Sequence, residues 1–593
     1  MLIRIGWHKK GKEVVPDGGA WRETKRYSIW SRQQGGDSDQ IVQKIARLGV
    51  IGALREIEER CAIAILDKEA QRLWLAADHL GSLALYYGQD REGIFFSGNL
   101  GALRLQRNLS LRIDPASLAL FLQYGYVLSP WTILDGIGKV SPGSVVMFDL
   151  KERSKREQRY WNPDIPYLEP KYNLDLDEAV DLTERSLIEI TETIRAGSGQ
   201  IGAFLSGGYD STLLALLLQR GGEKTLHTYT IGFGERGYDE APYAQKIADY
   251  LKTVHTTYYL QPDDLERFFY RIGPMMDEPL GDQALIPSMV VADLAQRDGM
   301  EYLVGGDGGD EIFGANSYMS RFSILEKSPR MLRRLASLSP LIIDRLLPFA
   351  SEGLHTQLYR YARMLRADNA TEALKFKDMI LAPDRMQRLI LGGFTPHPTL
   401  CETASVGRGS HFSDLLFSRM LQSYVFHDLV AKMCISTETG ERLRVALPYL
   451  ERSFIEKMAH IDYRIKNRNG PKSIQRQLLQ RHLPGTLTKR PKRGFSVPIM
   501  AWLQEEQRWI VEHFLSQKKI EEEGLFDPDV LLRLKDRFML KGRYPDGQLL
   551  WNLLMFELWY EEWKPSLSDH GVSSHIGAVE NHGTVASGEV PKQ

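Results

Sequence analysis

The stretch that decides the fold runs from Gln200 to Ser211 and reads QIGAFLSGGYDS. Its first part, Gln200–Leu205, is short and apolar, which predicts a buried strand. An apolar pattern resumes at Leu213–Gln219, where we predict a helix. Two glycines between them let the backbone turn tightly and approach a ligand without a Cβ atom in the way. The stretch therefore predicts a strand–loop–helix unit whose loop faces a ligand.

The composition of this loop suits a phosphate or pyrophosphate. A helix N-terminus presents N–H groups that lack intrahelical acceptors, and the hydroxyls of Ser206 and Ser211 stand beside them. Asp210 supplies a carboxylate that Mg²⁺ on a triphosphate would need. The alternative is a glycine turn capped by serine, but strand–SGGxDS–helix is the more specific interpretation. The loop is not a Walker A loop, since the Gly-Lys-Ser/Thr ending is missing.

Strand and helix patterns alternate on both sides of this unit. We predict strands at Thr225–Ile231 and Glu301–Val304, and helices at Leu174–Arg195 and Ala241–Leu251. Such alternation predicts a parallel sheet with helices on both faces. Residues from about 315 to 560 are mostly helical in pattern.

A second glycine-rich, acidic loop follows the predicted strand at Glu301–Val304 and reads GGDGGDE, Gly305–Glu311. Loops at the carboxyl ends of parallel strands converge on one crevice. Asp310 would then complete a Mg²⁺ site with Asp210. Alone, this loop fits a turn and a site equally well; paired with the first loop, it is predicted to be part of the site.

The first 150 residues have a different pattern of short strands bounded by charge or glycine. Strands are predicted at Cys61–Asp67, Leu73–Ala77, Gly93–Ser97 and Ser144–Phe148, with a helix at Leu118–Tyr124. From these patterns we expect a first domain over 1–150, a linker over 151–173, a second domain over 174–565 and a disordered tail over 566–593.

The composition excludes several classes of protein. The 593 residues are 43% hydrophobic and carry a formal net charge of -1, so a globally basic nucleic-acid binder is not indicated. Three cysteines, none in a C-x-x-C pair, exclude a disulfide scaffold and a cysteine-built zinc site and fit a reducing cytoplasm. The longest aliphatic run, Leu213–Leu218, is far shorter than the ~18 residues of a membrane span. We expect a cytoplasmic protein without nucleic-acid or membrane partners.

Several further motifs occur in a fixed order along the chain. They are DHLGSLALYY (Asp78–Tyr87), TILDGIGKVSPG (Thr132–Gly143), SGGYDS (Ser206–Ser211), YTIGF (Tyr229–Phe233), YDEAPYA (Tyr238–Ala244), DEP (Asp277–Pro279), GGDGGDEIFG (Gly305–Gly314) and KRPKRGFSVPIMAWL (Lys489–Leu503). From about residue 50 to 505 the sequence resembles the asparagine synthetase family.

This resemblance implies an α/β fold with two parts. The first is an N-terminal glutaminase-like domain of the Ntn-type αββα class. The second is a doubly wound α/β synthetase domain of the ATP-pyrophosphatase type with a large helical portion. The synthetase half activates a carboxylate as an acyl-adenylate, releases pyrophosphate and lets an amine attack, with ATP and Mg²⁺ as cofactors. By position, the metal ligands would be Asp210 and Asp310, and the ATP-binding residues Leu205, Ser206, Gly207, Gly208, Asp210, Ser211, Ile231, Gly232, Gly305 and Gly306.

Three more residues are candidates for catalysis. Lys472 and Lys492 fit the positions of two lysines of this family, and a lysine is a compact charge suited to a phosphate or an oxyanion. The alternative is a solvated basic stretch, because residues 464–493 contain ten Lys or Arg and no acid. We place Lys492 in the active site and leave both interpretations open for Lys472. Asp307 is either the base for the attacking amine or a loop carboxylate.

Two departures from the family pattern bear on function. A glutamine-dependent member needs a cysteine directly after the initiator methionine, and this chain has Leu2 there. Cys61 lies in a strand-like run and is predicted to be a core residue. We therefore expect an inactive glutaminase half. The segment Arg444–Tyr449 (RVALPY) keeps only the proline and the aromatic residue of the family's E-x-R-x-P-F, so the acceptor pocket is expected to differ.

A complete synthetase half beside an inactive glutaminase half resembles the lasso peptide cyclases and the β-lactam synthetases. We expect a lasso peptide cyclase that activates a side-chain carboxylate of a precursor peptide and closes a macrolactam with the peptide's N-terminal amine. A leader-peptide protease or recognition protein would be a further partner. The alternatives are an ammonia-dependent asparagine synthetase, a β-lactam synthetase-like cyclase of a small molecule, and a nucleotide-binding scaffold without catalysis.

Overall fold

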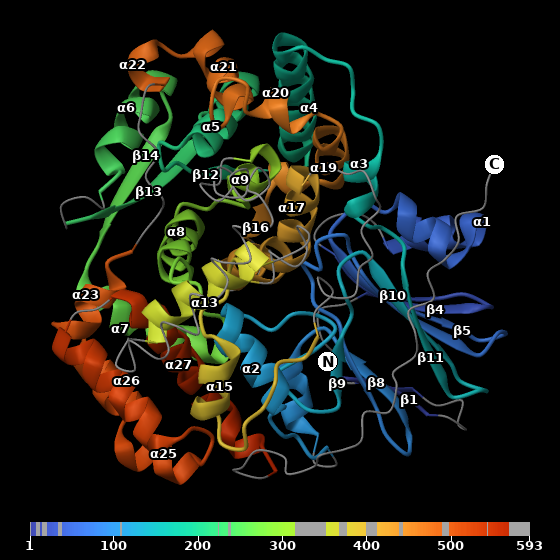
Figure 1. The fold of residues 1–593 in the computed structure, drawn as a ribbon. Coiled ribbons are helices and arrows are strands. Elements are labelled where there is room, and N and C mark those ends of the chain that lie inside the picture. The colour runs from blue at the N-terminus through green and yellow to red at the C-terminus, as the bar shows by residue number, and fades with distance from the viewer. Residues whose placement is uncertain are drawn as a thin grey trace. The chain divides into compact units, whose positions relative to one another are not determined.

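The structure of the chain, a computed structural model, contains two compact units (Figure 1). The residues it describes are 2–6, 12–14, 20–33, 38–106, 109–197, 199–222, 224–234, 239–314, 352–366, 376–398, 412–437, 443–488, 497–541 and 544–568. The first unit draws on the described residues of Met1–Pro115, Leu134–Trp161 and Leu567–Gln593, and the second on those of Ala116–Ile133 and Asn162–Ser566.

The first unit is built from two antiparallel sheets. One has the strand order β2 (Lys12–Val14), β1 (Ile3–Gly6), β8 (Gly93–Ser97), β7 (Tyr86–Gln89) and β9 (Ile137–Lys139). The other has the order β11 (Ser154–Arg159), β10 (Ser144–Asp149), β6 (Arg72–Ala77), β5 (Cys61–Asp67), β4 (Tyr27–Gln33) and β3 (Ala20–Glu23). The four strands predicted from the sequence are confirmed to within one residue at each end.

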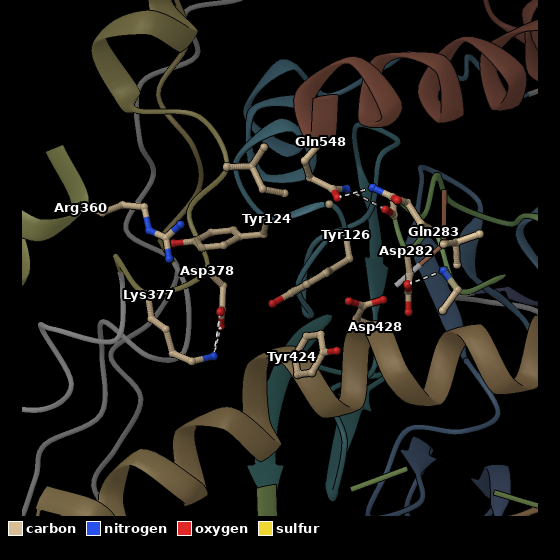
Figure 2. Close-up of a pocket in the computed structure, with 15 residues that line it drawn as sticks. Tyr124, Tyr126, Asp282, Gln283, Arg360, Lys377, Asp378, Tyr424, Asp428 and Gln548 are labelled. Atoms are coloured by element: carbon tan, nitrogen blue, oxygen red, sulfur yellow. Dashed lines mark hydrogen bonds and ion pairs between the residues drawn. The ribbon is translucent and has the colours of Figure 1, made fainter. Parts of the chain in front are cut away.

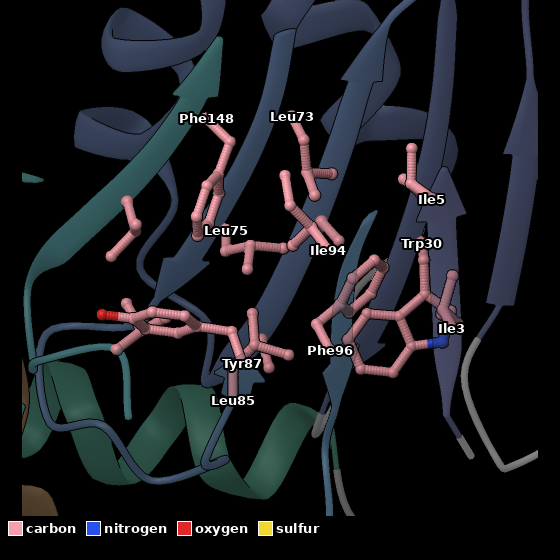
Figure 3. Close-up of a cluster of buried hydrophobic side chains, with 14 of the residues drawn as sticks. Ile3, Ile5, Trp30, Leu73, Leu75, Leu85, Tyr87, Ile94, Phe96 and Phe148 are labelled. Atoms are coloured by element: carbon pink, nitrogen blue, oxygen red, sulfur yellow. The ribbon is translucent and has the colours of Figure 1, made fainter. Parts of the chain in front are cut away.

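Alternating apolar side chains of the two sheets meet in one hydrophobic core (Figure 3). The Trp30 ring of β4 meets the Phe96 ring of β8 edge-on, with 6.1 Å between centroids. Tyr87 of β7 packs in the same way on Phe148 of β10, at 5.7 Å. These pairs join one sheet to the other, so the unit is a β-sandwich. Helix α1 (Ser38–Glu56) packs beside β3.

The second unit contains a five-stranded sheet in which every pair of neighbouring strands is parallel. Its order is β14 (Val254–Leu260), β13 (His227–Phe233), β12 (Ile201–Phe204), β15 (Tyr302–Val304) and β16 (Arg444–Ala446). In Figure 1, helices lie on both faces of this sheet, with α5 (Tyr209–Gly221) on one face and α8 (Leu285–Arg297) on the other. The predicted parallel α/β sheet is confirmed.

The order in which strands are added to the sheet reverses at its centre, between β12 and β15. From β12 the chain adds β13 and then β14 on one side, and it returns to add β15 on the other side of β12. Val304 of β15 pairs with Ala203 of β12, so the loops that follow these two strands begin side by side. Ligands of open α/β sheets bind at such a switch point.

Helices make up most of the rest of the second unit. They include α2 (Pro115–Tyr124), α3 (Asp164–Leu168), α4 (Leu176–Ala196), α6 (Ala241–Leu251), α7 (Pro262–Met275), α9 (Gly309–Phe313), α13 (Glu352–Arg366), α15 (Pro383–Leu389), α17 (Phe412–Met420), the π-helical segment Leu421–Leu429, α18 (Val430–Thr437), α19 (Arg452–Ala459), α20 (Tyr463–Lys466), α21 (Ser473–His482), α22 (Gly485–Thr488), α23 (Ile499–Gln504), α24 (Arg508–Phe514), α25 (Gln517–Glu523), α26 (Pro528–Lys541) and α27 (Tyr544–Trp563).

The units differ from the sequence-based domain limits in two places. The helix predicted at Leu118–Tyr124 belongs to the second unit, although it lies within residues 1–150. The segment 151–173, expected to be a linker, contains strand β11, which pairs with β10 along its whole length. The predicted tail, from residue 569 on, lies outside the described residues. Within the described part of the chain, no helix is long and apolar enough to cross a membrane.

Candidate active site

The loop after β12 turns directly into helix α5. Gly207 has a left-handed backbone (φ 72°), which residues with side chains rarely adopt. The Gly208 N–H donates to Ser206 Oγ at 3.3 Å, and the Ser206 N–H donates to Ser211 Oγ at 3.2 Å. The two hydroxyl oxygens lie 3.1 Å apart. Two serines therefore stand at the start of α5, beside the N–H groups of its first turn, as a phosphate site requires.

The loop after β15 lies against this start of α5. A Cβ atom on Gly306 would be 3.2 Å from the backbone nitrogen of Ser211, and one on Gly309 would be 2.6 Å from Cγ of Asp210. Gly308 between them is left-handed (φ 88°). Glycine at these positions lets the backbones of the two loops approach closely, so the structure brings together the two loops that the sequence analysis paired.

Gly309→Ala tests this close approach. The new methyl group would collide with the Asp210 carboxylate, and overpacking costs about 1–3 kcal/mol. We expect Mg²⁺-dependent ATP binding, measured by calorimetry, to weaken by about tenfold or more. Gly485→Ala is the control, because a Cβ atom on Gly485 would meet nothing within 4 Å. Equal ATP affinities for the two variants would contradict the prediction.

Lys472 connects the carboxylates of the two loops. Its Nζ forms an ion pair with Asp210 Oδ2 and lies 2.5 Å from Asp310 Oδ1. Gln475, one turn along α21, donates through Nε2 to Asp210 Oδ1 at 3.1 Å. The Tyr449 hydroxyl donates to the backbone oxygen of Asp210 at 3.1 Å. The side chain of Lys472 is therefore buried and lies beside both loops.

The electrostatics of this group follow from its burial. Burial raises the pKa of Asp210, Lys472 acts in the opposite direction, and Asp310 adds to the rise. Burial would lower the pKa of Lys472, but the two carboxylates outweigh it and hold that pKa above its ordinary value. Lys472 is therefore an ammonium ion that lies between the carboxyl groups of Asp210 and Asp310.

The residues present fit a Mg²⁺ ion. Asp210 and Asp310 converge on one point, now held by the Lys472 ammonium, and the side chain of Asp310 is 37% exposed toward solvent. Mg²⁺ commonly uses one or two carboxylates together with substrate phosphates rather than a full protein cage. The described residues contain no group of three or more His, Cys, Asp or Glu that could hold a metal alone.

Apart from Asp307, the remaining residues predicted for the site are Leu205, Ile231, Gly232, Gly305 and Lys492. Leu205 directly follows β12 and is 1% exposed, with its N–H donating to the Tyr229 carbonyl at 2.8 Å. Ile231 and Gly232 lie in β13, beside β12. Gly305 donates its N–H to Ala446 of β16 at 2.9 Å, which holds the second loop on the sheet. Lys492 falls in residues 489–496, outside the described residues.

Asp307 belongs to a second ionic group. Its Oδ1 lies 3.3 Å from Lys432 Nζ, which also lies 3.2 Å from Asp282 Oδ2. Lys432 is 6% exposed, and although burial opposes it, the carboxylates raise the pKa of this lysine. Lys432 and Asp282 are not among the residues predicted from the sequence. The sequence signal that could have indicated them is the single lysine in the apolar run of α18. A lysine buried by such neighbours needs an acidic partner, because an unpaired buried charge is costly.

A cavity of about 480 Å³ lies beside this second group. Asp282 lines it, together with Asp428 and Tyr424 of the π-helical segment and Tyr124 and Tyr126 at the end of α2 (Figure 2). The altered segment Arg444–Tyr449 does not line it. A parallel sheet with two glycine-rich loops at its switch point and an adjacent cavity defines a nucleotide-binding α/β domain with room for a second substrate.

Comparison with known proteins identifies the family. Residues 190–561 match the asparagine synthase family model, and residues 24–161 match the glutamine amidotransferase domain model. Since the first match covers more than half of the chain, the chain belongs to the asparagine synthase family. Its members are ATP-dependent ligases that form AMP and pyrophosphate. The second match agrees with the predicted glutaminase-like first domain.

Three relatives show how far the similarity extends. A putative asparagine synthetase of Methanocaldococcus jannaschii is 30% identical over 320 residues, 53% of this chain and 60% of that protein. An asparagine synthetase of Bacillus subtilis is 22% identical, covering 84% of this chain and 77% of the relative. A putative one of Mycobacterium tuberculosis is 25% identical, covering 88% and 79%. All three are described as glutamine-hydrolysing.

Proposed function

We propose that this protein is an ATP-dependent ligase that adenylates a side-chain carboxylate of a precursor peptide. The peptide's N-terminal amine then attacks, and a macrolactam closes as in a lasso peptide cyclase. The observation that carries the proposal is a contrast between the two units. The second unit assembles both nucleotide loops, whereas Cys61 of the first unit is buried and unsuited to releasing ammonia from glutamine. A substrate that carries its own amine removes the need for ammonia.

Cys61 supports this contrast. It is the one cysteine in the sequence of residues 1–161. It lies in β5, is 3% exposed, and burial raises the pKa of its thiol well above the ordinary value. The nucleophilic form of cysteine is the thiolate, which such a site disfavours. Cys61 is therefore a core residue of the sandwich.

In the proposed reaction, the residues of the second unit bind and orient ATP. Ser206, Ser211 and the start of α5 hold its phosphates, and Lys472 supplies a positive charge between the loops. Asp210 and Asp310 would hold Mg²⁺, which when bound neutralises phosphate charge. The carboxylate attacks the α-phosphate, pyrophosphate leaves, and the amine displaces AMP from the acyl carbon.

Glutaminase activity is expected to be absent from this chain. Glutamate release from glutamine should equal the rate without enzyme, because the buried Cys61 thiol is not a nucleophile. Cys61 should also resist a thiol reagent in the folded protein and react after unfolding. Glutamate release that is lost on Cys61→Ala would show that the first unit has been misinterpreted.

Lys492 is the proposed cation for the transition state. A preorganised cation is worth about 3–4 kcal/mol by comparison with lost oxyanion donors, so Lys492→Ala should lower turnover by at least ~100-fold with little change in ATP affinity. Turnover is followed as pyrophosphate release. Arg490→Ala and Arg493→Ala are the controls in the same basic stretch and should lose far less. Equal losses in all three variants would indicate a diffuse electrostatic patch.

Ammonia-dependent asparagine synthesis is the second candidate, favoured by the three asparagine synthetases to which the chain is similar. Incubation with ATP and Mg²⁺ separates the two functions. Pyrophosphate release that requires aspartate, with asparagine formed from ammonium chloride, would establish the second candidate. Release that requires a peptide with an acidic side chain, with loss of one water mass from that peptide, would establish the first. Release with neither, but with a small amino acid, would indicate a β-lactam synthetase-like cyclase.

A further inference from the structure

The cavity beside Asp282 uses none of the residues assigned to the nucleotide. At about 480 Å³ it falls within the range of small-molecule pockets, about 300–1,000 Å³. A molecule the size of water or ammonia takes up only about 30 Å³. The cavity is therefore much larger than a site for ammonia needs to be. The side chains that line it should be complementary to a larger substrate.

One end of the cavity is acidic. Asp282 and Asp428 line this end. Lys432 forms ion pairs with Asp282 and with Asp307, which belongs to the loop after β15. Three carboxyl groups thus share one cation among the described residues around them. Oδ1 of Asp428 is buried and accepts no hydrogen bond from any described residue. A buried acceptor without a donor is costly, so this oxygen calls for a donor supplied by a ligand.

The positive charges of the cavity lie elsewhere. Figure 2 shows Arg360 and the Lys377–Asp378 pair at the end away from Asp282 and Asp428. Lys377 Nζ is 2.7 Å from Asp378 Oδ1, so this lysine is neutralised by its neighbour.

Aromatic side chains form the wall between the two ends. Tyr124, Tyr126 and Tyr424 line the cavity between its two ends (Figure 2). Tyr424 and Asp428 both come from the π-helical segment, a geometry that recurs at functional sites. Tyrosine faces bind cations and apolar groups alike.

We propose that this cavity binds the amine substrate, with its ammonium group at Asp428 and Asp282 and its body along the three tyrosines. This inference rests on the proposed ligase function and adds the substrate's chemical class, a primary amine with an apolar body.

The position of the acidic end suits an attacking amine. Lys432 joins Asp282 to Asp307, and Asp307 belongs to the loop that follows β15. An amine held at Asp428 therefore lies next to the nucleotide loops. Burial and the neighbouring Asp282 raise the pKa of Asp428, and an ammonium ion beside this carboxyl would favour its charged form. Ligand and site thus stabilise each other's charge.

The first experiment compares two probes of similar length on the full-length wild-type chain. Calorimetric titration at pH 7 with 2-phenylethylamine, a cation, should give binding at least tenfold tighter than with 3-phenylpropionate, an anion. Equal affinities, or tighter binding of the anion, would overturn the proposal. This comparison requires no variant, so it holds whether or not a substituted chain folds.

Variants then locate the ammonium group. Asp428→Asn keeps the shape of the side chain and removes its charge, and we expect it to weaken 2-phenylethylamine binding by at least tenfold. Asp536→Asn, the same change on the exposed face of α26, should bind the amine as the wild type does. An Asp428→Asn affinity equal to that of the wild type would show that the ammonium group lies elsewhere and overturn the assignment.

Two peptides identify the source of the amine. If Phe-Gly-Gly amide binds and its N-acetyl form does not, the cavity accepts a peptide N-terminus. If only 2-phenylethylamine binds, the cavity takes a small amine. Either result supports an amine site, whereas equal binding of the acetylated and free peptides contradicts it.

Failure of this inference is distinguishable from failure of the proposed function. Pyrophosphate release measures adenylation of the carboxylate, which precedes attack by the amine. Release without any preference for the cationic probe would overturn the amine site alone. A preference for the cation without pyrophosphate release under any condition would overturn the ligase and leave an amine-binding site.

Discussion

Lys472→Met is expected to lower the free energy of unfolding by about 3 kcal/mol when Mg²⁺ is absent. The substitution leaves the carboxylates of Asp210 and Asp310 facing each other without the ammonium between them, and removing one partner of a buried ion pair costs about 3–5 kcal/mol. We take the lower end because Asp310 is 37% exposed and water screens its charge. Pyrophosphate release should fall by at least ~100-fold, since a cation beside the phosphates is lost.

The Lys472→Met variant also has a specific signature. Millimolar MgCl₂ should restore part of its lost stability in urea titrations, because a metal ion can stand where the ammonium stood. Lys466→Met is the matched control. Lys466 is also buried, and its Nζ donates to the carbonyl of Ile312 at 3.0 Å. Its variant should lose stability without recovery in MgCl₂. Recovery in both variants, or in neither, would contradict the arrangement at Lys472.

Asp210→Asn is expected to lower pyrophosphate release by at least ~1000-fold. Asp210 touches both Lys472 and the loop after β15, and it is one of the two carboxylates that fit Mg²⁺. An amide oxygen is a weaker ligand for Mg²⁺, and loss of the ion's charge stabilisation is worth several kcal/mol, about 4 for this factor. Calorimetry should show that ATP binding no longer depends on Mg²⁺.

The stability of Asp210→Asn should fall less than that of Lys472→Met, because Lys472 keeps Asp310 as a partner. Asp293→Asn is the control. Asp293 pairs with Arg271 at 2.6 Å in the same unit, so its variant breaks an ion pair away from the loops. It should lose some stability and keep its pyrophosphate release. If the folded Asp210→Asn variant releases pyrophosphate at a near-normal rate at saturating Mg²⁺, Asp210 is not a ligand of the metal.

The sequence by itself determined the class of fold and the two loops of the site. The strand–glycine–helix pattern at Gln200–Ser211 and the second loop at Gly305–Glu311 depend on local chemistry. Glycine conformations, strand periodicity and helix starts are set by residues close together in the chain. The convergence of the two loops then followed from a general rule for parallel sheets. For the same reason the core position of Cys61 was predictable from its strand-like surroundings.

The tertiary structure alone decided the surroundings of Lys472 and the existence of the cavity. In the sequence, Lys472 stands in a basic stretch that suits solvent as well as a site. Only the packing of α21 against α4 and α5 places it between two carboxylates. The cavity collects Tyr124, Asp282, Arg360 and Asp428 from four segments far apart in the chain. No local spacing relates such residues, because their proximity arises from how the helices pack on the sheet and on one another.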